Sequence, residues 1–192
     1  MPGMDSSRRD PTTSPWRTVA SRPVYENPWI AVREDDVVTP TGTSGIYGVV
    51  HKPLALGVVA IDAQDRVVLV GQWRYPLDRY SWELVEGAFD HGEDDTPLAG
   101  IQRELAEEAG LAAARWELLT ATPIALSNSV TDEMAMLWVA SGLTPVVAKT
   151  SDPTEELRVT RVPFAEAVAA TIDGRIDDAM SILGLLLADR RR

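Results

Sequence analysis

The sequence predicts an α/β fold with a mixed sheet, because strand-like and helix-like segments follow one another without a regular alternation. Apolar runs at 55–61 and 67–70 are typical of buried strands, and Asp62-Ala-Gln-Asp65 between them is typical of a turn. The pattern predicts further strands at 82–85, 116–121, 134–139 and 157–162, and helices at 97–110, 164–172 and 179–188. Pro97 suits a first helical turn and Gly110 suits a helix C-cap, so we expect the first helix to lie between them.

The N-terminal part of the chain carries the pattern of antiparallel strands. Apolar residues alternate with others between residues 24 and 51, and Pro40-Thr41-Gly42 interrupts them as a turn does. We therefore expect a β-hairpin region at 16–52 and a main domain at 53–192. Residues 1–15 are polar, contain three prolines and three serines, and lack the apolar stretch of a signal peptide, so we expect a disordered tail.

The composition narrows the class of protein. Hydrophobic residues make up 45% of the 192 residues, which is enough for a buried core. No apolar run of about 18 residues occurs, so no membrane span is expected. The absence of cysteine excludes disulfides and thiolate metal sites and fits a cytoplasmic location. The net charge of −11 disfavours general binding of nucleic acid, and it reflects either solubility or a metal site that a phosphate ligand completes.

The predicted helix at 97–110 concentrates acidic residues beside its apolar arc. At about 100° per residue, the arc that faces the core consists of Leu98, Ile101 and Leu105. The carboxylates along one flank of this arc are Glu104, Glu107 and Glu108. Arg103 relieves only Glu107 through an i,i+4 pair, so the repulsion needs another explanation. Oxygen ligands grouped in this way suit Mg²⁺ or Mn²⁺, and the alternative is an ordinary solvated helix face.

This region resembles the Nudix box, which runs Gly, five residues, Glu, seven residues, and then Arg-Glu-hydrophobic-x-Glu-Glu-x-Gly-hydrophobic. Gly87 and the run Arg103-Glu-Leu-Ala-Glu-Glu-Ala-Gly-Leu111 match it, but nine residues, not seven, separate Glu93 from Arg103. Counting forward from Gly87 assigns the first acidic position to Glu93, whereas counting back from Arg103 assigns it to Asp95. The two extra residues therefore enlarge the loop before Pro97.

The resemblance implies an α/β/α sandwich in which the box forms a loop-helix-loop, and hydrolysis of a nucleoside diphosphate linked to another group. By position, the implied metal ligands are Glu104, Glu107, Glu108, the carbonyl of Glu86 and, unless it only holds the loop, Glu93. Arg103 would orient the helix glutamates. The implied cofactor is Mg²⁺, with Mn²⁺ as the alternative, because a divalent cation neutralises a diphosphate and acidifies water.

A wider part of the chain resembles one subgroup of the family, the ADP-ribose and nucleotide-sugar pyrophosphatases. The segments that carry this resemblance are 25–50, 72–76, 82–87 and 174–182. In that subgroup the N-terminal strands commonly exchange between the subunits of a homodimer, and both subunits build the site. The subgroup also has an acidic loop, at 152–157 in this sequence, that supplies a catalytic base or another metal contact.

The catalytic base is the role with the most open alternatives. The loop position favours Glu155, with Glu156 next, because a base must reach the attacking water. Glu133, in a polar stretch before a predicted strand, is a third candidate. Ordinary solvation of the loop is the alternative for Glu155 and Glu156.

Two arginines and one tryptophan are candidates for contact with the substrate. Arg74 and Arg79 would clamp a phosphate or the terminal ribose, since a guanidinium is a planar multiple donor, and the alternative is a surface ion pair. Trp29 would stack on a base, as Trp73 or Trp82 would, and the alternative for each is core packing.

These features together predict a Mg²⁺-dependent hydrolase that splits the diphosphate of ADP-ribose or of a nucleotide sugar into a nucleoside monophosphate and a sugar phosphate. We expect a homodimer that binds this small molecule and neither nucleic acid nor membrane. One alternative is a catalytically inert Nudix-fold module that senses a nucleotide. Another is a Nudix hydrolase of other nucleotides, such as nucleoside triphosphates.

Overall fold

The computed structural model describes residues 13–89, 91–92, 94–147 and 156–192, so most of the predicted tail lies outside the described residues. The chain divides into two compact units. An N-terminal unit ends at Lys52 and also contains Ser129–Asp132, and a main unit comprises Pro53–Asn128 and Glu133–Arg192. In the part of the chain that is described, no helix has both the length and the apolar character needed to cross a membrane.

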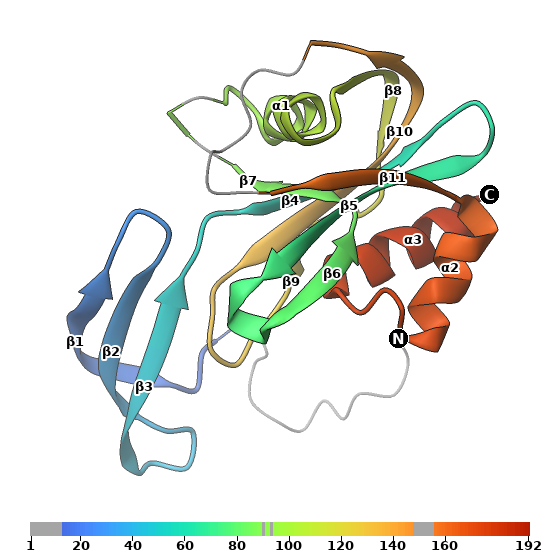
Figure 1. The fold of residues 1–192 in the computed structure, drawn as a ribbon. Helices are drawn as coiled ribbons and strands as arrows, with labels where there is room; N and C mark the ends of the chain where they lie inside the picture. Colours follow the sequence, from blue (N-terminus) through green and yellow to red (C-terminus); the bar gives the residue numbers. More distant parts are fainter. Residues whose placement is uncertain (1–12, 90, 93, 148–155) are drawn as a thin grey trace. The chain divides into compact units, whose positions relative to one another are not determined.

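Three antiparallel strands form the N-terminal unit (Figure 1): β1 (Arg17–Glu26), β2 (Ala31–Val38) and β3 (Ser44–His51). The pair β2–β3 matches the predicted hairpin, and its turn places Gly42 at φ 89°. Strand β1 extends beyond the predicted pattern, because all its residues are exposed and burial imposes no apolar alternation. Polar bonds attach β1 to β2 instead: Ser21 Oγ donates to Asp35, and Arg22 pairs with Glu34.

The main unit is built on a mixed sheet of eight strands. Its central path runs β11-β5-β4-β10-β8, with β6 paired to β5, β7 to β4 and β9 to β10. Strands β4 and β10 are parallel, and the other described pairs are antiparallel. The strands are β4 (Ala55–Ile61), β5 (Arg66–Arg74), β6 (Arg79–Glu83), β7 (Val85–Ala88), β8 (Leu111–Leu118), β9 (Ile124–Ala125), β10 (Met134–Pro145) and β11 (Arg158–Pro163).

Helices cover both faces of this sheet, as Figure 1 shows: α1 (Pro97–Ala109) lies on one face, and α2 (Phe164–Asp173) and α3 (Ala179–Arg191) lie on the other. The apolar run of β4 therefore supplies side chains to two cores. The α1 side contains Leu56, Val58, Ala60, Ile101 and Leu105, and the opposite side contains Val59, Phe164 and Leu185. The predicted α/β/α sandwich with a mixed sheet is confirmed.

Local signals set the bounds of α1. The Oγ1 of Thr96 accepts a hydrogen bond from the N–H of Ala99 at 3.1 Å, which satisfies one of the donors left over at a helix start. Pro97 is the first helical residue, and Gly110 ends the helix at φ 64°, as expected for a glycine C-cap. The helix therefore begins and ends where the sequence predicts.

Two strand predictions need correction. Strand β8 begins at Leu111, directly after the helix, and not at residue 116, because the alanines that follow Leu111 show no apolar alternation. Residues 82–85 are not one strand: β6 ends at Glu83 and pairs with β5, whereas β7 begins at Val85 and pairs with β4. Between them the N–H of Leu84 donates to the Oγ of Ser181 at 2.9 Å. Leu84 is therefore the residue at which the chain changes from pairing with β5 to pairing with β4.

Candidate active site

Gly87 lies where a carboxylate of α1 meets the sheet. On β7 it stands opposite Leu56 of β4. A Cβ at Gly87 would overlap the Cγ, Cδ and Oε1 atoms of Glu104, which all lie closer than real Cβ contacts allow. The missing side chain therefore lets the Glu104 carboxylate rest against the backbone of β7.

Arg103 joins the acidic side chains of the box. Its Nε and Nη2 donate to Oδ1 and Oδ2 of Asp94 at 3.1 Å each. Its Nη1 lies 2.9 Å from Oε1 of Glu104 and donates to Oε2 of Glu107, also at 2.9 Å. These contacts raise the pKa of Arg103, and the bond with Asp94 is the largest cause. One guanidinium therefore holds three carboxylates.

Burial shapes the acidity of the box. Desolvation raises the pKa of Glu104 to about 7, against the opposing charge of Arg103 and with a further contribution from Glu107. On the next turn, Oε2 of Glu108 is shielded from solvent. A carboxyl group that ionises near neutral pH exchanges its proton for a cation readily, because metal ligands must be deprotonated.

The donor set fits a hard divalent cation such as Mg²⁺. Among the described residues, the donors that the sequence predicts for such a cation are the carboxylates of Glu104, Glu107 and Glu108 and the backbone carbonyl of Glu86, and Gly87 leaves room for the first of them. Within residues 13–89, 91–92, 94–147 and 156–192, no three His, Cys, Asp or Glu side chains already converge as a metal cluster. Instead, Glu104 and Glu107 are paired with Arg103.

The side chain of Glu86 belongs to the other side of the sheet, since neighbouring residues of a strand face opposite ways. Ser181 Oγ donates to its Oε1 at 3.1 Å, and the N–H of Ser181 donates to Asp178 at 2.8 Å. Burial, followed by the adjacent charge of Asp178, holds the pKa of Glu86 well above its usual range. The carboxyl group of Glu86 therefore joins β7 to the start of α3. Only the backbone carbonyl of Glu86 is left as a candidate metal ligand.

A second arginine lies at the end of β5. The Nε of Arg74 donates to both carboxylate oxygens of Glu83 at 3.0 Å, and the side chain of Glu83 is only 4% exposed. Arg79, on β6, forms an ion pair with Asp177. Both predicted substrate-binding arginines line one cavity of about 240 Å³, together with Asp178. The structure thus brings Arg74 and Arg79 together, each paired with a carboxylate.

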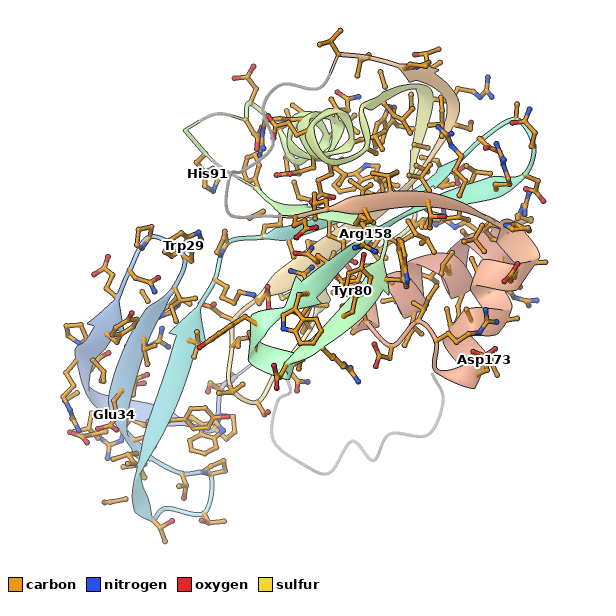
Figure 2. The ribbon with its side chains drawn as sticks, in the orientation of Figure 1. Trp29, Glu34, Tyr80, His91, Arg158 and Asp173 are labelled. Atoms are coloured by element: carbon orange, nitrogen blue, oxygen red, sulfur yellow. The ribbon has the colours of Figure 1, made fainter. Side chains whose placement is uncertain are left out.

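The three candidate tryptophans differ in exposure. Trp29, which is labelled in Figure 2, lies in the loop between β1 and β2. It is 73% exposed. Trp73 is also exposed, whereas Trp82 packs against the core on the α2 and α3 side. The ring centroids of Trp82 and Tyr80 lie 5.6 Å apart in a T-shaped arrangement. Arg158 lies 5.9 Å from the ring of Tyr80, and both are labelled in Figure 2. Core packing therefore accounts for Trp82, whereas Trp29 and Trp73 are exposed.

The candidate bases are described only in part. Glu156 is exposed and lies two residues before the start of β11, and Glu133 is half-buried and directly precedes β10. Glu155, the preferred base, and Glu93, the doubtful ligand, lie outside the described residues.

Two acidic residues in these clusters were missed by the sequence reasoning. One is Asp94, which lies between Glu93 and Asp95. The spacing from Gly87 indicates Glu93 and the spacing from Arg103 indicates Asp95, so neither count indicates Asp94. Glu83 forms the buried pair with Arg74 and interrupts an otherwise apolar segment, which is a usable signal because a buried acid is rare without a partner.

Comparison with known proteins identifies the family. A model described as the NUDIX domain matches residues 51–181, and a model described as the nucleoside diphosphate sugar hydrolase N-terminal domain matches residues 16–50. The chain belongs to the Nudix family and is a Nudix hydrolase, so the predicted family and enzyme class are confirmed.

Individual relatives extend over most of the chain. An ADP-ribose pyrophosphatase of Mycobacterium tuberculosis is 30% identical over 172 residues, which cover 89% of this chain and 82% of the relative. A methanol dehydrogenase activator of Bacillus methanolicus is 29% identical over 170 residues, or 88% and 90% of the two chains. The crystal structure of an ADP compounds hydrolase shares the fold, with a TM-score of 0.79 at 22% identity over 92% of this chain and 93% of that one.

Proposed function

We propose that this Nudix hydrolase splits the diphosphate of ADP-ribose or of a nucleoside diphosphate sugar. The observation that carries the proposal is the set of box carboxylates that Arg103 gathers beside Gly87. The match of residues 16–50 to the N-terminal domain of nucleoside diphosphate sugar hydrolases and the likeness to the Mycobacterium tuberculosis pyrophosphatase support the choice of substrate.

In this proposal the box binds the cation and Arg103 sets its geometry. Glu104, Glu107 and Glu108 would hold Mg²⁺, or Mn²⁺, with the carbonyl of Glu86. When bound, the cation neutralises the diphosphate and lowers the pKa of water. Arg103 keeps the carboxylates from repelling one another out of position, because its guanidinium contacts two of them within 3 Å.

The reaction needs a proton acceptor and a substrate clamp besides the box. One phosphorus–oxygen bond of the anhydride breaks, the oxygen of water bonds to phosphorus, and the water proton passes to a base, for which we propose Glu155 or Glu156. Arg74 and Arg79 would contact the phosphates or the terminal ribose from the walls of their shared cavity. Trp29 offers an exposed indole ring on which a base can stack.

A homodimer in the cytoplasm is the assembly and location that we propose. Strand β1 is a long edge strand, exposed along its whole length, with Val19, Val24 and Tyr25 among its exposed apolar residues. Such an edge favours pairing with another chain. Light scattering checks this, and an active monomer would contradict a site shared between subunits. The cysteine-free composition supports the location.

The experiment that tests the function is a substrate panel with Mg²⁺. We expect ADP-ribose or a nucleoside diphosphate sugar to be cleaved to two phosphomonoesters, and the panel also contains GDP-mannose, UDP-glucose, dinucleotides and nucleoside triphosphates. Chromatography of the products identifies the bond that breaks. Faster hydrolysis of triphosphates than of any diphosphate-linked sugar would contradict the proposal.

A further inference from the structure

Asp94 is the acidic residue that grips the box arginine. It bonds Arg103 through both carboxylate oxygens at 3.1 Å, in the two-pronged geometry that gives arginine–carboxylate pairs their directional strength. Its side chain is 3% exposed, against 24% for Arg103. A carboxylate that is almost completely buried is stable in its charged form only when it is paired. The pair with Arg103 is therefore part of the structure of this loop.

The position of Asp94 accounts for the irregular spacing of the box. Six residues separate Gly87 from Asp94, and eight separate Asp94 from Arg103. The box pattern has five and seven, so one extra residue lies on each side of Asp94. Because aspartate is one methylene shorter than glutamate, the longer loop is matched to a shorter side chain that still reaches the guanidinium.

The packing around Asp94 is specific to this residue. A Cβ at Gly100, on the first turns of α1, would lie 2.8 Å from Oδ2 of Asp94 and 2.7 Å from a methyl carbon of Leu56. The bare glycine thus makes room for the carboxylate. The next residue along the chain, Asp95, is an exposed aspartate, so it offers a matched control.

We propose that Asp94 is the positioning residue of the box in this chain, in place of Glu93 or Asp95. It fixes the guanidinium of Arg103, which in turn fixes Glu104 and Glu107. The inference rests on the proposed function insofar as these glutamates bind the cation, and it predicts that loss of the Asp94 charge weakens cation binding although Asp94 is not itself a ligand.

The test compares Asp94→Asn with Asp95→Asn, using Mn²⁺ as the probe of the box. We expect Asp94→Asn to raise the Kd for Mn²⁺, measured by calorimetry, about tenfold or more and to lower kcat by a similar factor, which is the size of effect seen when groups that orient metal ligands are lost. Asp95→Asn should leave both near wild type. Asp94→Glu, which keeps the charge, should recover most of the Mn²⁺ affinity.

The outcomes separate positioning from mere stability. A variant Asp94→Asn that melts earlier but binds Mn²⁺ and turns over as wild type does would overturn the proposal, as would an equal loss in Asp95→Asn. If Asp94→Asn does not fold, the proposal stands only if folded Asp94→Glu binds Mn²⁺ more weakly than Asp95→Asn and more tightly than Arg103→Lys. Wild-type protein that binds Mn²⁺ yet cleaves no diphosphate-linked sugar would refute the proposed substrate alone, and the Mn²⁺ comparison would still decide the role of Asp94.

Discussion

Two arginines of the main unit are each surrounded by carboxylates, and they differ in where those carboxylates come from. Arg103 contacts Asp94, Glu104 and Glu107, all within ten residues of it in the chain. Arg74 donates to Glu83 across the β5–β6 pair. The negative charge of Asp178, which is far from Arg74 in the sequence, contributes to raising the pKa of Arg74.

The difference shows which clusters a one-dimensional pattern can reveal. Around Arg103, helical periodicity and one loop bring the partners together, so spacing alone indicates most of the set. Around Arg74, the fold of the sheet and the start of α3 do so, and no fixed spacing connects them. The residues of the box can therefore be predicted from the sequence, whereas the residues that line the cavity beside Arg74 cannot.

The largest effect is expected at the box, from Glu108→Gln. Turnover with Mg²⁺ should fall at least ~100-fold while the fold persists, because the change removes the charge of a proposed metal ligand and keeps its shape. Steady-state kinetics together with circular dichroism check this. Near-normal Mg²⁺-dependent turnover would sink the metal assignment.

At the second arginine the expected effect is on stability. Arg74→Ala should destabilise the protein by about 3 kcal/mol, because it leaves the carboxylate of Glu83 buried without its partner. Arg79→Ala should cost less than ~1 kcal/mol, because Asp177 is 37% exposed. Urea unfolding measures both, and equal losses would show that burial of the partner does not separate the two pairs.

A smaller effect is expected where the box meets the sheet. Gly87→Ala should lower turnover about tenfold, because the new methyl group displaces the carboxylate of Glu104 and a shift of about 1 Å in a catalytic group costs this much or more. Gly48→Ala is the control, since a Cβ there meets nothing within 4 Å. Unchanged turnover in Gly87→Ala would mean that Glu104 can move without loss.

The smallest effect is a pH dependence of stability in the cation-free protein. Folding raises the pKa of Glu104 from 4.5 to about 7, so ionising this group costs the folded state free energy. The protonated carboxyl group therefore contributes to the stability of the fold at low pH, and this contribution is lost as the pH rises through about 7. Glu104→Gln mimics the protonated acid. Its melting temperature relative to wild type, measured with a chelator present, should therefore rise between pH 5 and pH 8. A constant difference would contradict the raised pKa.

How much of the site could be predicted depended on the range of each interaction. The helix bounds at Pro97 and Gly110 followed from residues whose own backbone preferences suit the first turn and the C-cap of a helix. The grouping of Glu104, Glu107 and Glu108 followed from helical periodicity. Asp94 escaped prediction because a loop has no fixed period, so its neighbours Glu93 and Asp95 fitted the pattern equally well. Glu83 escaped because its partner becomes adjacent only through strand pairing.

The sequence by itself determined the family, the α/β class and the acidic helix, because each depends on residues that are near one another in the chain. Only the tertiary structure decided that Asp94 holds Arg103, that Arg74 and Arg79 line one cavity, and that the Glu86 side chain faces Asp178. These contacts require strand register, a loop path and the packing of α3, and those are set by burial across the whole sheet.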